Sequence, residues 1–292
     1  ALLLLSACTP GAAAPGSQPS DGVLHIAATT WPVYCFTTAV TKELENVQVT
    51  PVLNVQTSCL HDYTLTVDDM KTLEGADVVV LNGAGLEDFM SDALGASSAQ
   101  TIDASAGIEL LTLPDGSTDP HIWMDPDRAA MMVQNIATGL SKLDPARADD
   151  FQNNADIALD TLAGLAAKGR DTLAELDCRE MITFHDGFGY FADTFNLTIL
   201  KAIEVEEGSE ASAKDINEVV SLIQDHRLPA IFVEVNGSDA TAQAIARETG
   251  VEVAQLSMIM SGSGSGLEPY VEAMSQNTGT VRTALGGMEE GN

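Results

Sequence analysis

Basic residues are scarce in this chain, and the apolar run near its start is short. The sequence of 292 residues has 13 Lys and Arg against 43 Asp and Glu, which gives a formal net charge of −30. A surface of this sign repels nucleic acid and anionic lipid headgroups, so a nucleic-acid partner is excluded. The four consecutive leucines at positions 2–5 are too few to span a bilayer.

Two common functional motifs are also missing. The sequence contains no His-Glu-x-x-His motif, in which two histidines bind zinc and the glutamate serves as general base. The stretch Asn82-Gly83-Ala84-Gly85 lacks the full glycine fingerprint of a dinucleotide-binding turn and its acidic partner. These absences argue against a zinc protease and against nucleotide binding.

The chain does have enough apolar material for a sizeable core. Hydrophobic residues make up 45% of it and charged residues only 19%. Its length suits one large domain or two of medium size.

The first residues are predicted to lie outside the fold. Residues 1–7, which end in Ser6-Ala7, are typical of the end of a lipoprotein signal peptide, and Cys8 is then the residue that accepts the lipid. Residues 8–22 are rich in Pro, Gly, Ala and Ser, which is typical of a flexible tether. The sequence therefore predicts export and a lipid anchor on the outer side of the bacterial cytoplasmic membrane, at the cell surface or the periplasmic side.

Three further cysteines would be exported with the rest of the chain. An odd number in an oxidising compartment predicts one disulfide and one free thiol. Cys35 and Cys59 each follow one of the first two predicted strands, so a doubly wound sheet would bring them to the same edge, and they are the preferred pair. Cys178 is predicted to be a buried, unpaired residue.

Short apolar runs alternate with stretches of helical spacing throughout the chain, which predicts an α/β fold with parallel strands and right-handed crossovers. The predicted strands are residues 24–28, 47–55, 78–81, 101–102, 181–184, 197–203, 230–235 and 251–256. Residues 127–177 contain no strand signal. Their second part, from Pro145 to about Leu176, predicts a helix roughly 45 Å long if unbroken, which can act as the spine between two lobes.

Three histidines lie at or shortly after short apolar runs. His61 follows residues 52–55, His121 follows residues 110–113, and His185 follows residues 181–184. Side chains beyond the carboxyl ends of strands point into the ligand crevice of an open α/β sheet, and imidazole there is a candidate metal ligand. His25, inside the first predicted strand, and His226, in a polar turn, are predicted to be structural or exposed.

A set of motifs in consistent order resembles the zinc/manganese substrate-binding lipoproteins of bacterial ABC transporters. The motifs are the lipobox with its tether, Thr30-Trp31-Pro32-Val33-Tyr34, His61-Asp62-Tyr63, Ala76-Asp77-Val78 with Asn82-Gly83-Ala84-Gly85-Leu86-Glu87, Asp119-Pro120-His121-Ile122-Trp123, His185-Asp186 with Phe188-Gly189-Tyr190-Phe191, and Ile231-Phe232-Val233-Glu234. The resemblance implies two doubly wound parallel-sheet lobes joined by a long backbone helix, with a metal site in the cleft between them.

The same resemblance implies the domain organisation and the partners. Residues 23–143 would form the N-terminal lobe, residues 144–177 the linking helix, and residues 178–292 the C-terminal lobe. His61 and His121 would come from the first lobe and His185 from the second. The expected function is capture of a metal ion outside the cell by a monomeric, lipid-anchored protein, which delivers the ion to an ABC permease.

Three imidazoles favour zinc over manganese, because manganese prefers a richer set of carboxylates. The family usually supplies an aspartate after the last strand as fourth ligand, but Ser257 stands at that place here. A hydroxyl is a poor zinc ligand. The fourth ligand is therefore either a water molecule or a carboxylate from the acidic loop after residues 197–203, which contains Glu204, Glu206 and Glu207. Glu234 is a weaker candidate. Asp62, Asp125 and Asp186 are candidates to orient the ligands or to cap helices.

Two alternatives to a zinc-transport protein remain. One is a manganese-specific binding protein. The other is a zinc hydrolase, because three histidines with an open position also describe a catalytic zinc. A hydrolase needs a substrate pocket and a positioned general base, for which the sequence shows no motif, so the expectation is that the protein is not an enzyme.

Overall fold

Two sets of four strands, separated by long helices, make up the molecule. The computed structural model describes residues 22–54, 63–113, 116–203, 212–235 and 239–286. The strands are β1 (Leu24–Ala28), β2 (Val47–Pro51), β3 (Val78–Leu81), β4 (Gln100–Asp103), β5 (Glu180–Thr183), β6 (Thr198–Ala202), β7 (Ala230–Glu234) and β8 (Glu252–Leu256). The α-helices are α1 (Trp31–Val40), α2 (Val67–Glu74), α3 (Ser91–Ala96), α4 (Pro126–Leu143), α5 (Ala148–Thr172), α6 (Gly189–Phe195), α7 (Ala213–His226), α8 (Ala240–Thr249) and α9 (Glu268–Leu285), with 3-10 turns η1 (Asp88–Met90), η2 (Ile122–Met124) and η3 (Pro145–Arg147).

Each set of strands forms its own parallel sheet, and the two sheets have the same topology. The strand order is β2-β1-β3-β4 in the first and β6-β5-β7-β8 in the second. The register pairs Leu24 with Val47 and Ile26 with Val78 in the first sheet, and Ala230 with Glu252 in the second. The predicted α/β fold with two doubly wound lobes is confirmed. We call the first sheet with its helices the N-terminal lobe and the second sheet with α6 to α9 the C-terminal lobe.

The predicted strand at residues 47–55 and the apolar run at residues 110–113 differ most from the observed structure. The strand predicted over residues 47–55 ends at Pro51. The next two backbone N–H groups, of Val52 and Leu53, still donate to the carbonyls of Ala28 and Thr29 at 2.8 and 3.0 Å. The apolar run 110–113 before His121 is no strand of either sheet, because its backbone groups pair locally in a narrow turn. Thr112 forms an isolated antiparallel bridge with Thr118 there.

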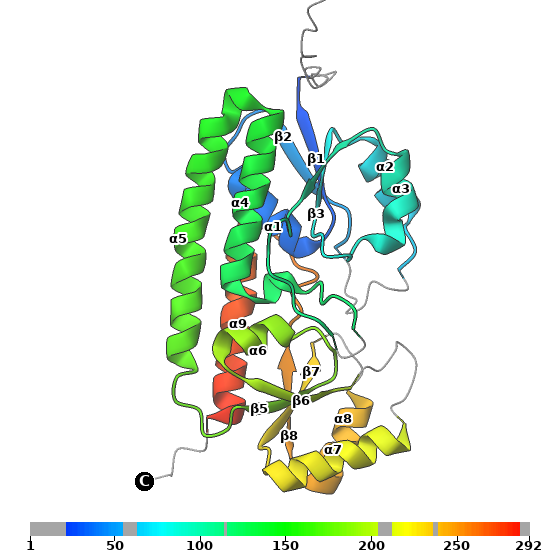
Figure 1. Cartoon of the computed structure of the whole chain (residues 1–292), viewed down its shortest axis with the longest axis vertical. Coiled ribbons are helices and arrows are strands. Elements are labelled where there is room, and N and C mark those ends of the chain that lie inside the picture. The colour runs from blue at the N-terminus through cyan, green and yellow to red at the C-terminus, as the bar shows by residue number, and fades with distance from the viewer. Residues whose placement is uncertain (1–21, 55–62, 114–115, 204–211, 236–238, 287–292) are drawn as a thin grey trace, which may run out of the picture.

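The long helices run beside both lobes (Figure 1). Pro145 opens a 3-10 turn rather than the α-helix itself, and α5 then spans 25 residues and ends at Thr172, short of the predicted Leu176. Gly169 lets α5 approach α6, since a Cβ there would lie 2.6 Å from the Phe195 ring. The spine helix is thus confirmed, while the boundaries at residues 143/144 and 177/178 remain predictions.

Helix ends follow signals that are visible in the sequence. Thr66 and Asp69 form a reciprocal capping box at the start of α2, and Ser212 caps α7 through the backbone N–H of Asp215. Asp125 caps α4, in which Pro126 occupies the first position, where a missing N–H costs nothing. Gly250 ends α8 in the left-handed region at φ 78°.

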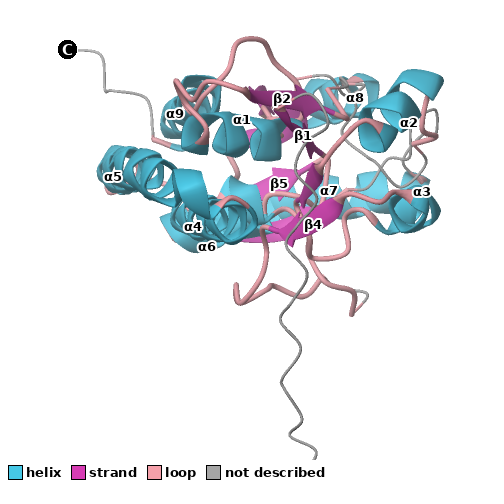
Figure 2. Ribbon diagram, turned by 90° about the horizontal axis from the view of Figure 1, so that it is seen from above, coloured by secondary structure: helices cyan, strands magenta, loops and turns pink. Residues whose placement is uncertain are grey.

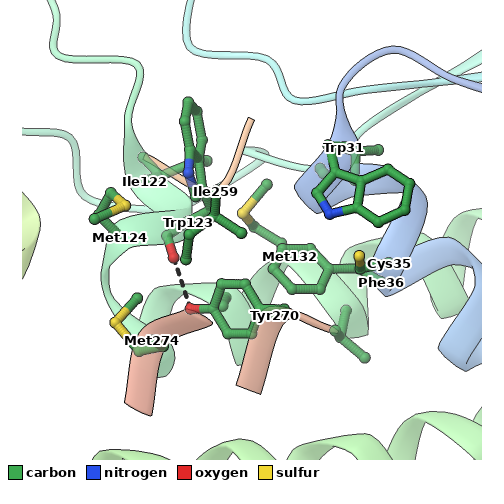
Figure 3. Close-up of a cluster of buried hydrophobic side chains, with 14 of the residues drawn as sticks. Trp31, Cys35, Phe36, Ile122, Trp123, Met124, Met132, Ile259, Tyr270 and Met274 are labelled. Atoms are coloured by element: carbon green, nitrogen blue, oxygen red, sulfur yellow. Dashed lines mark hydrogen bonds between the residues drawn. The ribbon is translucent and has the colours of Figure 1, made fainter. Parts of the chain in front are cut away.

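One hydrophobic core contains buried residues from both lobes. Figure 3 shows side chains from α1, η2, α4 and α9 packed together, and α9 contacts α1 and α5 although it follows the last strand of the C-terminal lobe. Trp123, Phe36 and Tyr270 are fully buried there. A second, smaller cluster lies between the C-terminal sheet and α7 and α8. Figure 2 shows the strands between one group of helices with α4 and α5 and another with α2 and α3.

The structure describes two of the four cysteines, of which Cys35 differs from the prediction and Cys178 is unpaired as predicted. Cys35 is a free thiol, fully buried in the central core (Figure 3), and burial raises its pKa to about 12. The predicted Cys35 to Cys59 disulfide is therefore not formed in this structure, because the Cys35 side chain points into the core; Cys59 itself lies outside the described residues. Cys178 is a free, half-buried thiol.

Within the described residues, no helix is long and apolar enough to cross a membrane.

Candidate metal centre

His185 lies just beyond β5, one of the two central strands of the C-terminal sheet. The strand ends at Thr183, and the backbone N–H of Phe184 donates to the carbonyl of Phe232 in β7 at 2.9 Å. Nδ1 of His185 lies 3.4 Å from Oε1 of Glu234, the buried last residue of β7. Two neighbouring strand ends thus supply the imidazole and a carboxylate beside it, as expected at the carboxyl edge of a parallel sheet.

His121 comes from the N-terminal lobe but not from a strand end. It precedes the turn η2, in the long connection between β4 and α4. Oδ1 of Asp119 accepts hydrogen bonds from the His121 backbone N–H at 2.9 Å and from Nδ1 of its ring at 2.8 Å. Both side chains are buried. Because an ionised carboxylate only accepts hydrogen bonds, Nδ1 of His121 is the donor in this contact, and in a neutral ring the lone pair is then on Nε2.

The two histidines meet between the lobes. Their Nε2 atoms lie 3.3 Å apart, and their rings are perpendicular with centroids 5.1 Å apart. Each ring turns its Nδ1 to a carboxylate and its Nε2 to the other histidine. Two ring nitrogens at this distance attract each other only when one carries a proton toward the other or when a cation lies between them.

The distance between the two nitrogens fits a metal ion. Imidazole nitrogens bind zinc at about 2.0–2.1 Å, so two of them in a tetrahedral site lie about 3.3–3.4 Å apart. The observed 3.3 Å agrees with this value. Carboxylates on the remote ring nitrogens are the usual outer partners of metal-bound histidines, since they fix the tautomer and raise the basicity of the ligand.

The other predicted ligands lie outside the described residues. His61 belongs to the gap at residues 55–62, and Glu204, Glu206 and Glu207 belong to the gap at 204–211. Among the residues that the structure describes, no group of three or more His, Cys, Asp or Glu is placed to hold a metal. His121 and His185 are therefore two members of the predicted set that the structure brings together.

Ser257 has a structural role in the turn after β8. Its Oγ accepts the backbone N–H of Ile259 at 3.0 Å, and its own backbone N–H donates to Oδ1 of Asn277 at 2.8 Å. Beside the His185 loop lies Met258, whose methyl group would be 2.6 Å from a Cβ at Gly187. A side chain at position 187 would therefore displace the His185 ring or the end of Met258.

The carboxylates found beside the two histidines are Asp119 and Glu234. Asp125, which was predicted either to orient a ligand or to cap a helix, caps α4 and forms an ion pair with Arg128 at 2.7 Å. Asp62 lies outside the described residues. Asp119 was missed, although its place two residues before His121 was a usable signal, and Glu234 was considered only as a ligand. His226, which was predicted to be structural or exposed, lies at the exposed end of α7, where its Nδ1 is 2.9 Å from Oε2 of Glu180.

Beneath the His121 segment lies a buried polar network in the N-terminal lobe. Glu87 accepts hydrogen bonds from the Thr29 hydroxyl at 2.6 Å and from the backbone N–H groups of Asn82 and Gly83 at 2.7 and 3.0 Å. The Asn82 amide in turn donates to the carbonyl of Pro120 at 3.0 Å. Burial raises the pKa of Glu87 to about 6, although its hydrogen bonds favour the charged form.

Comparison with known proteins matches this arrangement. The model of the family described as zinc-uptake complex component A, periplasmic (ZnuA), matches residues 26–284, which include both histidines. The chain belongs to the ZnuA family. The high-affinity zinc uptake system protein ZnuA of Bacillus subtilis is 26% identical over 304 residues, which cover 97% of this chain and 94% of that protein.

Solved structures of ZnuA-like proteins share the two-lobe fold. A crystal structure of ZnuA superposes with a TM-score of 0.80 at 27% identity, and it covers 90% of this chain and 99% of its own. The substrate-binding protein FpvC of Pseudomonas aeruginosa, solved in complex with Ni2+, also reaches a TM-score of 0.80 at 28% identity, with 91% of this chain and 99% of its own covered. FpvC is also solved with Mn2+, and a ZnuA deletion mutant is solved with zinc bound, so ZnuA-like folds occur with different metals.

Proposed function

We propose that this protein is the extracytoplasmic binding component of a zinc-uptake ABC system, which captures Zn2+ between its lobes and delivers it to a membrane permease. The observation that carries the proposal is the pair of buried histidines from opposite lobes, with Nε2 atoms 3.3 Å apart and a carboxylate at each Nδ1. Membership of the zinc-uptake family supports it. The strongly acidic chain favours the approach of a cation.

The proposed ligand set extends beyond these two histidines. His61 supplies the third imidazole, and the fourth position is taken by water or by one carboxylate of Glu204, Glu206 and Glu207. Ser257 is left outside this set, because its hydroxyl accepts a backbone N–H in the turn after β8. Three imidazoles and one oxygen make a four-coordinate site that suits zinc better than manganese.

The site supports transport better than hydrolysis. A catalytic zinc needs a general base beside its bound water. The two carboxylates found at the histidines, Asp119 and Glu234, both face ring Nδ1 atoms and so serve to orient ligands. The family's role as an uptake component agrees with the proposal that the protein is not an enzyme.

A titration of the metal-free protein tests the proposal. One Zn2+ should bind per chain, and melting temperature should rise, because a ligand specific for the folded state adds about 4 kcal/mol of stability at a thousandfold excess over Kd. Competition with Mn2+ in the same titration distinguishes the manganese alternative. Stabilisation by Mn2+ but not by Zn2+ would contradict the zinc assignment, and no stabilisation by either would contradict the metal site.

Membrane attachment through Cys8 is a further part of the proposal, together with a monomeric state. In cells, replacement of Cys8 by Ser should release the protein from the membrane fraction, while a Cys178→Ser variant should stay bound. Mass spectrometry of the membrane-bound form should find a lipid on Cys8. Release of both variants, or of neither, would contradict the predicted anchor.

A further inference from the structure

The segment that carries His121 belongs to the N-terminal lobe, but side chains of the C-terminal lobe hold it. Tyr190, in α6, is fully buried and places its hydroxyl between two backbone groups of the long connection after β4. The hydroxyl donates to the carbonyl of Asp119 at 2.8 Å and accepts the N–H of Leu111 at 2.9 Å. Burial raises the pKa of Tyr190 to about 12, so the hydroxyl keeps its proton.

A second tyrosine holds the same segment on the other side of His121. The hydroxyl of Tyr270, in α9, donates to the carbonyl of Trp123 at 2.6 Å, the hydrogen bond drawn in Figure 3. The indole N–H of Trp123 donates to the carbonyl of Met258, just after β8, at 2.8 Å. All of these groups are buried, where an unpaired donor or acceptor costs more than in water.

The two tyrosines hold the backbone at equal distances in sequence on either side of His121. Tyr190 binds the residue two positions before His121, and Tyr270 binds the residue two positions after it. Asp119, whose backbone Tyr190 holds, is also the residue whose carboxylate fixes the His121 ring. Gly189, next to Tyr190, brings α6 so close that a Cβ there would lie 2.8 Å from Oδ2 of Asp119.

We propose that Tyr190 and Tyr270 are positioning residues for His121, so that the C-terminal lobe places both imidazoles of the metal pair. This inference rests on the proposed function. It follows that the two histidines cannot be drawn apart by a rotation of the lobes unless these buried hydrogen bonds break first. The pair is therefore a preformed half of the metal site, which orders little further when the ion arrives.

The test removes one hydroxyl at a time from otherwise intact protein. Tyr190→Phe keeps the ring beneath the Arg128 guanidinium, which lies 4.8 Å from the ring centroid, and loses only the two hydrogen bonds. Tyr270→Phe keeps the ring packed against Phe36. Tyr34→Phe is the control, because the half-buried Tyr34 ring stacks on Trp31 of the same helix, α1. Zinc affinity is measured by competition with a chelator, and melting temperature without metal is measured alongside.

Tyr190→Phe should weaken zinc binding roughly tenfold, as loss of an outer partner of a metal ligand does. Tyr270→Phe should weaken it less, and Tyr34→Phe should not. In a His121→Ala background the effect of Tyr190→Phe on zinc affinity should shrink to within about twofold, because a residue that acts through His121 has nothing left to position. The loss of melting temperature should persist in that background.

Three outcomes would overturn the inference. Wild-type affinity in both tyrosine variants, with a lowered melting temperature, would show a purely structural role. A full tenfold loss in the His121→Ala background would show that Tyr190 acts through general stability. Wild-type protein that binds no zinc would reject the proposed function and this inference with it, and the wild-type titration separates that case from the other two.

Discussion

The two lobes have the same strand order but present their histidines by different means. In the C-terminal lobe, His185 follows the end of β5 almost at once, and its carboxylate partner Glu234 ends the neighbouring strand β7. In the N-terminal lobe, β4 ends at Asp103, and the chain continues through a long connection before it reaches His121. Asp119, the partner of His121, lies in that same connection.

This difference shows two ways of making a rigid ligand. A residue beside a central strand inherits its position from the sheet, and the hydrogen bonds of the strand hold it. A residue in a long connection needs supports from elsewhere in the molecule. His121 has such supports in Asn82 of its own lobe and in Tyr190 and Tyr270 of the other. The strand-end histidine and the loop histidine should therefore respond differently to changes around them.

Removal of either imidazole should have the largest effect. His121→Ala and His185→Ala should each weaken zinc binding by at least about a hundredfold, more than the roughly 10–100-fold typical for loss of an outer partner. Isothermal titration with chelator competition measures the loss. His226→Ala is the control, because His226 pairs with Glu180 on the surface. Near wild-type affinity in one of the two site variants would show that this histidine is no ligand.

The carboxylates behind the two rings should matter unequally. Asp119 contacts Nδ1 of His121 at 2.8 Å, whereas Glu234 lies 3.4 Å from Nδ1 of His185. Asp119→Asn should therefore weaken zinc binding about tenfold or more, and Glu234→Gln should weaken it less. The same competition titration compares them. A larger loss for Glu234→Gln would reverse the order and point to direct metal binding by Glu234.

Close approach of the lobes at Gly189 is the next feature to test. A methyl group there would lie 2.8 Å from the buried Asp119 carboxylate, so Gly189→Ala should cost about 1–3 kcal/mol of stability and also weaken zinc binding. Gly164→Ala, on the exposed side of α5 with nothing near its Cβ position, should instead add about 0.5–1 kcal/mol. Urea unfolding measures both. Equal effects of the two substitutions would contradict the tight contact.

The last expected effect comes from the buried network of the N-terminal lobe, and it depends on pH rather than on zinc. Burial raises the pKa of Glu87 from 4.5 to about 6, so the folded protein binds this proton more tightly than the unfolded chain does. Its contribution to stability is thus largest below about pH 4.5 and falls by about 2 kcal/mol as the pH rises through 6.

A Glu87→Gln variant isolates this contribution, because glutamine does not titrate while the other carboxylates titrate in both proteins. The difference in unfolding free energy, wild type minus variant, should fall between about pH 4 and pH 7 and stay constant above. Urea titrations at several pH values give this difference. A difference that is flat across this range, or that rises with pH, would show that Glu87 is not held at a raised pKa.

Local sequence signals were sufficient for much of the fold and for His185. The alternation of apolar runs with helical spacing predicted an α/β fold with parallel strands, because strand and helix periodicities depend on neighbouring residues alone. The division into two doubly wound lobes came from the resemblance to the family. His185 lies where a strand-end histidine was predicted, since its support is the strand beside it. The long helix was predicted to open at Pro145, and the structure has a 3-10 turn there before α5 begins at Ala148. The caps of α2 and α7 were not predicted, although they too depend on nearby residues.

Tertiary contacts alone decided the rest. The run before His121 is apolar but joins neither sheet, because its backbone groups bond to residues 116–119 and to Tyr190, which is far along the chain. Cys35 lies in the core because α9 returns to pack on α1, which nothing near Cys35 reveals. The 3.3 Å between two imidazole nitrogens from opposite lobes depends on how the lobes pack, and a linear sequence carries no direct measure of such packing.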